Sequence, residues 1–124
     1  MFKNVVNAGL LTGFQVSSSW PTILHLQYAD DILIFCDASE QELHNLSTFF
    51  LCCQLALGLK VNVHKTAIVG ISCSNSLLDS LASILGCKVE KFPLKYLGVS
   101  ISDRKLNRAT WDPLIHRCQV KFDL

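Results

Sequence analysis

Apolar and polar side chains alternate over residues 24–28, with apolar residues at 24, 26 and 28 and polar residues at 25 and 27. This two-residue period is typical of a strand with one buried face. A continuous apolar run at 32–36 predicts a second, more fully buried strand. Asp30 and Asp31 stand between the two runs. Because aspartate is disfavoured in strands and common in turns, the pattern predicts a β-hairpin with both aspartates at its bend.

Helical spacing of apolar residues predicts four helices. The first covers residues 2–11 and has no capping residue before it. The second begins with a capping-box pattern, in which Ser39 accepts a backbone N–H and Glu42 reaches back to the cap, and it ends at Gly58. A third helix follows Ser74 or Ser76. The fourth carries an apolar stripe over residues 111–122, begins near Thr110 or Asp112, and has Pro113 in its first turn.

Further strands are expected at residues 67–71 and 87–92, with another strand or hairpin over 94–101. Gly98 in the last of these would permit a bulge or a close backbone approach. Helices and strands in this order predict an α+β fold, an antiparallel sheet with helices on one face. The first expected helix has no start signal and the last has no closing signal, so we expect the chain to be part of a longer one.

Composition narrows the class of protein. The 124 residues suit one small domain, and 50% hydrophobic with 17% charged residues argues against disorder. No apolar segment reaches the roughly 18 residues that a membrane span needs, and the first residues do not resemble a secretory signal. The six cysteines show no zinc-site spacing. We therefore expect reduced core thiols in an intracellular protein.

The net charge of +1 conceals an asymmetry. Residues 1–59 hold one base and five acids, a balance of −4, whereas residues 60–124 hold ten bases and five acids, a balance of +5. This division is compatible with a metal site beside a surface that binds a polyanion, and equally with ordinary surface charge.

The residues alone leave two interpretations of the aspartate pair. Two adjacent carboxylates on a rigid hairpin suit a hard cation such as Mg²⁺, but a solvated Asp-Asp turn without a ligand is also common. Lys65, just before a predicted strand, is similarly either a cation for a phosphate or a solvated lysine.

Five blocks of sequence resemble, in order and spacing, the reverse transcriptases of plant non-LTR (LINE-type) retrotransposons. The blocks are His25–Asp31, Gly58–Thr66, Leu85–Cys87, Phe92–Val99 and Trp111–Ile115. The resemblance covers nearly the whole chain. It implies a fragment of an RNA-directed DNA polymerase, with residues 1–108 as the C-terminal part of the palm and 109–124 as the beginning of the helical thumb.

The resemblance also implies roles for individual residues. Asp30 and Asp31 would be the catalytic metal ligands, holding Mg²⁺ for two-metal nucleotidyl transfer. Lys65 would be a catalytic cation near the incoming triphosphate. The partners would be an RNA template and a DNA primer. The nucleic-acid-binding residues, which would lie against the primer, would be Tyr28, Ala29, Tyr96, Leu97 and Gly98. The location would be the nucleus or the cytoplasm.

One departure from the family bears on activity. Such polymerases need another catalytic aspartate on a preceding strand, yet residues 1–29 contain no Asp or Glu. Mg²⁺ would then be bound weakly or not at all, and we expect the chain alone to be inactive. The alternative function is a non-catalytic α+β remnant that serves as an interaction module or has no function. A phosphoacceptor domain is a weaker third possibility. An exposed sheet edge would allow self-association.

Overall fold

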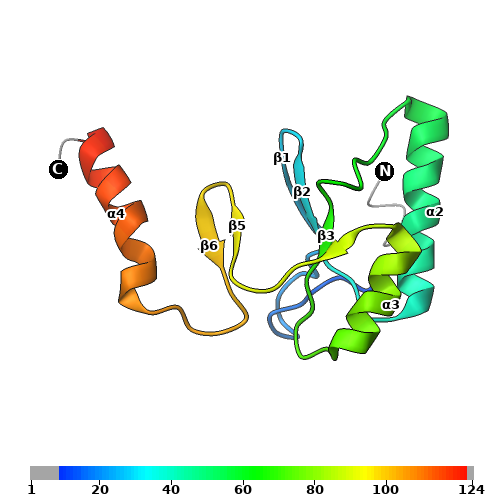
Figure 1. Ribbon diagram of the computed structural model, residues 1–124, viewed down its shortest axis with the longest axis horizontal. Helices are drawn as coiled ribbons and strands as arrows, with labels where there is room; N and C mark the ends of the chain where they lie inside the picture. Colours follow the sequence, from blue (N-terminus) through cyan, green and yellow to red (C-terminus); the bar gives the residue numbers. More distant parts are fainter. Residues whose placement is uncertain (1–8, 123–124) are drawn as a thin grey trace.

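The computed structural model describes residues 9–122 and has an α+β architecture, as the sequence predicts (Figure 1). Its described helices and strands are, in chain order, β1 (His25–Tyr28), β2 (Asp31–Ile34), α2 (Glu40–Leu57), β3 (Ala67–Ile68), α3 (Asn75–Leu85), β4 (Lys88–Val89), β5 (Leu94–Tyr96), β6 (Val99–Ile101) and α4 (Arg108–Phe122). The first predicted helix, at residues 2–11, lies outside the described residues as far as residue 8. Of its remaining residues, 9 and 10 form a turn and a bend.

The described strands pair in three separate two-stranded sheets. β1 with β2 and β5 with β6 are antiparallel hairpins, whereas β3 and β4 are parallel and are connected through α3. Strands were expected over residues 67–71 and 87–92, but each pairs over only two residues. The chain passes close to α3 after β3, since a Cβ at Gly70 would lie 2.5 Å from a methyl group of Leu78. This close approach accounts for the early end of β3.

Helix α2 begins and ends as its sequence predicts. The Ser39 hydroxyl accepts a hydrogen bond from the Glu42 N–H at 3.2 Å, and Gly58 closes the helix in the left-handed conformation at φ 69°. The second half of the predicted capping box is wrong. The Glu42 carboxylate turns to Asp37 and Thr12, and the Ser39 N–H donates to the Asp37 carbonyl at 2.8 Å instead.

The hydrophobic core lies where α2 meets α3 and the base of the β1–β2 hairpin. Leu11, Leu24 and Leu46 form one buried cluster, and the α2 face also buries Leu43. Helix α3, capped by the hydroxyl of Ser74 and closed by Gly86, contributes the buried side chains of residues 78, 81 and 82. The strand at 32–36 was expected to be more fully buried, but Ile32 is 38% exposed, because no other strand or helix of residues 9–122 packs against β2.

Helix α4 differs most from expectation. It begins at Arg108, where the Asn107 side chain accepts hydrogen bonds from the N–H and the hydroxyl of Thr110. Pro113 therefore lies in the second turn, not in the first. None of the helix residues is buried, and its apolar stripe is largely open to solvent. The expected thiol core also applies only in part, because Cys52 and Cys118 are exposed; none of the six cysteines forms a disulfide.

No helix within residues 9–122 combines the length and the apolar character that crossing a membrane requires.

Candidate nucleic-acid and metal site

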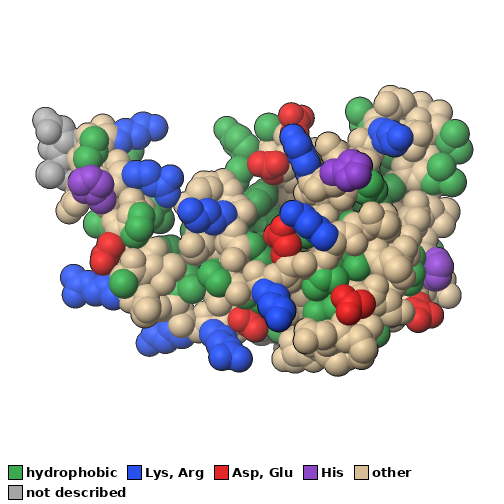
Figure 2. All heavy atoms as spheres, viewed as in Figure 1, with side chains coloured by type: hydrophobic (Ala, Val, Ile, Leu, Met, Phe, Trp, Pro, Cys, Tyr) green, Lys and Arg blue, Asp and Glu red, His purple; other side chains and the backbone are tan. Residues whose placement is uncertain are grey.

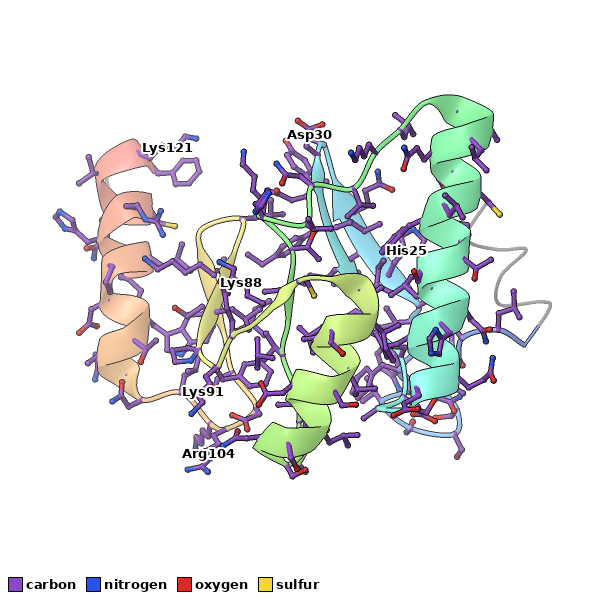
Figure 3. All side chains as sticks on the ribbon, turned by 45° about the vertical axis from the view of Figure 1, so that its right-hand side comes forward. His25, Asp30, Lys88, Lys91, Arg104 and Lys121 are labelled. Carbon is purple, nitrogen blue, oxygen red and sulfur yellow. The ribbon has the colours of Figure 1, made fainter. Side chains whose placement is uncertain are left out.

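The β1–β2 hairpin holds the aspartate pair on a two-residue turn. Tyr28 pairs with Asp31 across the strands, so Ala29 and Asp30 form the bend and Asp31 opens β2. The hairpin is therefore as predicted, with one aspartate at the bend and the other beside it. Asp30, labelled in Figure 3, lies at the outer tip of the hairpin. All four residues are exposed, and Tyr28 retains 67% of its surface.

The turn contains backbone strain. Ala29 adopts φ 51°, a left-handed conformation that an L-residue other than glycine seldom occupies. Such a conformation persists only where surrounding structure enforces it, and the cross-strand pairing from His25–Ile34 to Tyr28–Asp31 provides that constraint. The carboxylates are thus presented at a fixed place in the fold, although nothing in the residue pattern predicts this strain.

Lys65 lies in the loop between α2 and β3. Asn62 organises this loop, since its carbonyl accepts from the Lys65 N–H at 3.1 Å and from the Thr66 hydroxyl at 2.8 Å. The Lys65 side chain is exposed. Both ribbon views show the segment leading into β3 beside the β1–β2 hairpin (Figures 1 and 3). The fold therefore brings the loop of Lys65 to the side of the molecule that carries the aspartates.

The β5–β6 hairpin presents the third predicted group. Leu97 and Gly98 form its turn, at φ 53° and 79°, the paired left-handed conformations that suit the twist of a tight hairpin. Gly98 therefore lies in a tight turn that makes a close contact, and it does not form a bulge. This turn and that of β1–β2 lie on the same side of the molecule (Figure 1). The two hairpins do not contact each other, because the β5–β6 hairpin contacts only α4 among the described helices and strands.

The aspartates supply donors of the right type for Mg²⁺, but they do not complete a metal site. Hard divalent cations prefer carboxylate oxygens, and a site built by a protein usually collects several of them. Within residues 9–122, no group of three or more His, Cys, Asp or Glu side chains could hold a metal ion. The pair is therefore part of a ligand set, and the described residues do not fit a complete catalytic metal centre.

A shallow hollow of about 200 Å³ lies between α2, the loop after it and the end of α3. Its lining is largely apolar, with Phe50, Leu51 and Leu85 among its residues. The Thr66 hydroxyl at its edge already donates to the Asn62 carbonyl. The hollow therefore offers little chemistry of its own.

Two thiols near the hairpins are poor nucleophiles. Burial, reinforced by the Glu42 and Asp37 carboxylates, raises the pKa of Cys36 from 9.0 to about 11. Burial also raises the pKa of Cys87. Since the thiolate is the reactive form, neither cysteine provides a nucleophile at neutral pH.

Comparison with protein families identifies the fold. Residues 5–101 match the family model described as reverse transcriptase (RNA-dependent DNA polymerase), which is more than half of the chain. The chain belongs to the reverse transcriptase family. Neither the curated proteins nor the solved structures contain a match. The matched region of this reverse transcriptase chain includes both hairpins and the loop of Lys65, and it ends where β6 ends.

Enzymes of this family bind a nucleic-acid template and primer and use a divalent metal. The sequence places the candidate residues in and beside the two hairpin turns and in one loop, and Ala29, Asp30, Lys65, Leu97 and Gly98 among them are exposed. It did not assign the roles of two further residues. Glu42 was identified only as a helix cap, and Arg117, which contacts the β5–β6 turn, was one basic residue among many.

Proposed function

We propose that this chain is the C-terminal part of the palm of a reverse transcriptase from a plant non-LTR, LINE-type retrotransposon. Residues 1–108 would be palm and residues 109–124 the beginning of the thumb. The five blocks of sequence resemblance support the origin, and the end of the family match at residue 101 supports the boundary. In the complete polymerase the chain would act on an RNA template and a DNA primer, in the nucleus or the cytoplasm.

The observation that carries this proposal is the rigid hairpin turn with two adjacent carboxylates. Asp30 and Asp31 are proposed as metal ligands for nucleotidyl transfer, and Tyr28 and Ala29 as residues that lie against the primer terminus. Two further elements support the assignment by their position. The loop of Lys65, proposed to meet the triphosphate, runs beside this hairpin, and the turn of Tyr96–Gly98, proposed to grip the primer, lies on the same side (Figure 1).

We further propose that the chain alone does not polymerise DNA. Two carboxylates on one turn leave most of the coordination sphere of Mg²⁺ to water, so binding by the isolated chain should be weak. The absence of Asp and Glu from residues 1–29 supports this, because no carboxylate of that segment can join the pair.

Titration with Mg²⁺ and Mn²⁺, followed by NMR, tests the metal assignment. We expect millimolar metal to shift or broaden the amide signals of residues 29–32 in the wild type and to leave them unchanged in Asp30→Asn. Asp79→Asn is the matched control, since it removes one carboxylate from an exposed position of α3. Equal responses of wild type and Asp30→Asn would contradict the assignment.

A nucleotide-incorporation assay tests the proposed inactivity. The purified chain, given an RNA template, an annealed DNA primer and Mg²⁺, should extend no primer above background. Template-dependent extension that is lost in Asp30→Ala and kept in Asp79→Asn would show that the chain is an active polymerase by itself.

A second candidate function is a non-catalytic interaction module. The observation that favours it is the exposed apolar surface, since Leu26 on β1 is 44% exposed and Leu51 and Leu55 on α2 are 54% and 78% exposed. Among the described residues, neither hairpin pairs with a further strand, and strand edges of this kind are templates for pairing with another chain. Sedimentation measurements over a range of concentrations test this function, and a monomer at every concentration would argue against self-association.

A further inference from the structure

Helix α4 is attached to the rest of the described chain by few contacts. It buries none of its residues, and β6 is the one described strand or helix that it contacts. Figure 1 shows it standing beside the β5–β6 hairpin, away from α2 and α3. A helix held so loosely by apolar packing needs a specific contact to keep one orientation.

Arg117 makes such a contact. Its guanidinium Nη2 donates a hydrogen bond to the carbonyl oxygen of Gly98, at 2.8 Å, over 19 positions of sequence. Among the hydrogen bonds seen in residues 9–122, this is the one that joins a side chain of α4 to the β5–β6 hairpin. A hydrogen bond from a charged donor is shorter and stronger than one between neutral groups.

Gly98 fits this contact in two ways. Its φ of 79° is in the left-handed region, which allows the tight turn and directs the carbonyl outward. A Cβ at this position would lie 3.2 Å from Nη1 of Arg117, closer than nearly all such contacts. The absence of a side chain therefore lets the guanidinium approach the turn.

We propose that Arg117 is a positioning residue, which fixes α4 against the turn of the β5–β6 hairpin. The consequence for binding rests on the proposed function. Figure 2 shows Lys and Arg side chains gathered over the part of the surface formed by α4 and the β5–β6 hairpin. The cations of these two elements are Lys95 on β5 and Arg108, Arg117 and Lys121 on α4. A fixed spacing between the two elements would place these cations in register with the phosphates of a nucleic-acid duplex.

The rotational freedom of α4 in the free protein tests the positioning role. Trp20→Phe leaves Trp111, on α4, as the single tryptophan, and the hydrogen bonds seen for Trp20 use only its backbone. In this background Arg117→Ala is compared with Arg108→Ala, which removes an equal charge from α4 without a described contact. Arg117→Lys retains the charge and one donor but not the forked geometry.

In the decay of Trp111 fluorescence anisotropy, we expect Arg117→Ala to add a fast nanosecond component that Arg108→Ala does not show. Arg117→Lys should give an intermediate amplitude. Identical decays for the two alanine variants would overturn the proposal, because α4 would then be held without Arg117. Since Arg117 is exposed, its replacement should leave the far-ultraviolet circular dichroism unchanged.

Affinity for an RNA–DNA hybrid duplex, measured by titration with a labelled duplex, tests the consequence. We expect Arg117→Ala to raise Kd several-fold more than Arg108→Ala, although each removes one charge. Equal losses would mean that Arg117 acts only as a charge, which would contradict the consequence for binding. If the wild type bound no duplex while Arg117→Ala still loosened α4, the proposed function would fail and the positioning role would stand.

Discussion

The carboxylate of Glu42 accepts a hydrogen bond from the backbone N–H of Asp37 at 2.9 Å, and the same oxygen accepts from the N–H and the hydroxyl of Thr12 at 3.3 and 3.2 Å. Glu42 is 9% exposed. One side chain of α2 therefore connects the segment before the β1–β2 hairpin to the segment after it. This contact holds the two ends of the hairpin base at the start of the helix.

Removing this carboxylate should destabilise the chain. We expect Glu42→Ala to lower the free energy of unfolding by about 2–3 kcal/mol, since three donors lose a charged acceptor that is itself buried. Glu42→Gln keeps one acceptor oxygen and should cost about 1 kcal/mol. Urea denaturation followed by circular dichroism measures both. Glu40→Ala is the control, because it removes the same charge from an exposed position in the same helical turn, and a loss as large as that of Glu42→Ala would contradict the prediction.

Relieving the strained turn should stabilise the β1–β2 hairpin. Ala29→Gly removes the cost of a left-handed alanine, roughly 1–2 kcal/mol, and adds the greater chain entropy of glycine in the unfolded state, roughly 0.5–1 kcal/mol. The net gain should be about 0.5–1 kcal/mol. Urea denaturation tests it against Ala38→Gly, which has no left-handed conformation to relieve and should lose stability. A loss in both variants would mean that the turn is not strained.

Adding a methyl group at Gly98 should disturb both the turn and its contact with Arg117. Gly98→Ala is expected to cost about 1–2 kcal/mol for the left-handed backbone, with a further cost from crowding of the guanidinium. Gly58→Ala is the matched control, because φ is 69° there and a Cβ would meet nothing within 4 Å. In an Arg117→Ala background the additional cost at Gly98 should disappear. NMR signals of Tyr96 and Val99 report the hairpin directly.

The raised pKa of Cys36 predicts a loss of stability in alkaline solution. The unfolded thiol ionises at its ordinary pKa of 9.0 and the folded thiol only at about 11, so ionisation favours the unfolded state between these values. The contribution of Cys36 is complete below pH 9.0 and declines as the pH rises to about 11. The difference in unfolding free energy between wild type and Cys36→Ala should therefore shrink over this range. Cys52→Ala, which removes an exposed thiol, is the control for the loss of a cysteine.

Local sequence signals predicted which helices and hairpins form better than they predicted how long the strands are. The caps at Ser39 and Ser74 and the glycines that close α2 and α3 were recognised because each acts through neighbouring residues. The β1–β2 hairpin was recognised for the same reason. The lengths of β3 and β4 depend on how close the chain passes to α3, which the sequence of one strand does not encode.

The candidate site likewise has features that local sequence predicts and contacts that it does not predict. The turns that carry Asp30 and Gly98 follow from local sequence, and the family resemblance assigned their roles. The contacts of Glu42 with Thr12, 30 positions away, and of Arg117 with Gly98 join distant segments. Periodicity gives no information about such pairs. The start of α4 was missed because Asn107, its cap, lies among polar residues that look like a loop.

The three separate sheets have a consequence for how the chain unfolds. Within the described residues every strand belongs to a two-stranded sheet and is therefore an edge strand, while the buried leucines come from α2, α3 and the segments beside the base of one hairpin. Cooperative melting should therefore be confined to the helical centre. The β5–β6 hairpin and α4 should open first, at lower denaturant, as a sub-global unit with its own rapid amide hydrogen exchange.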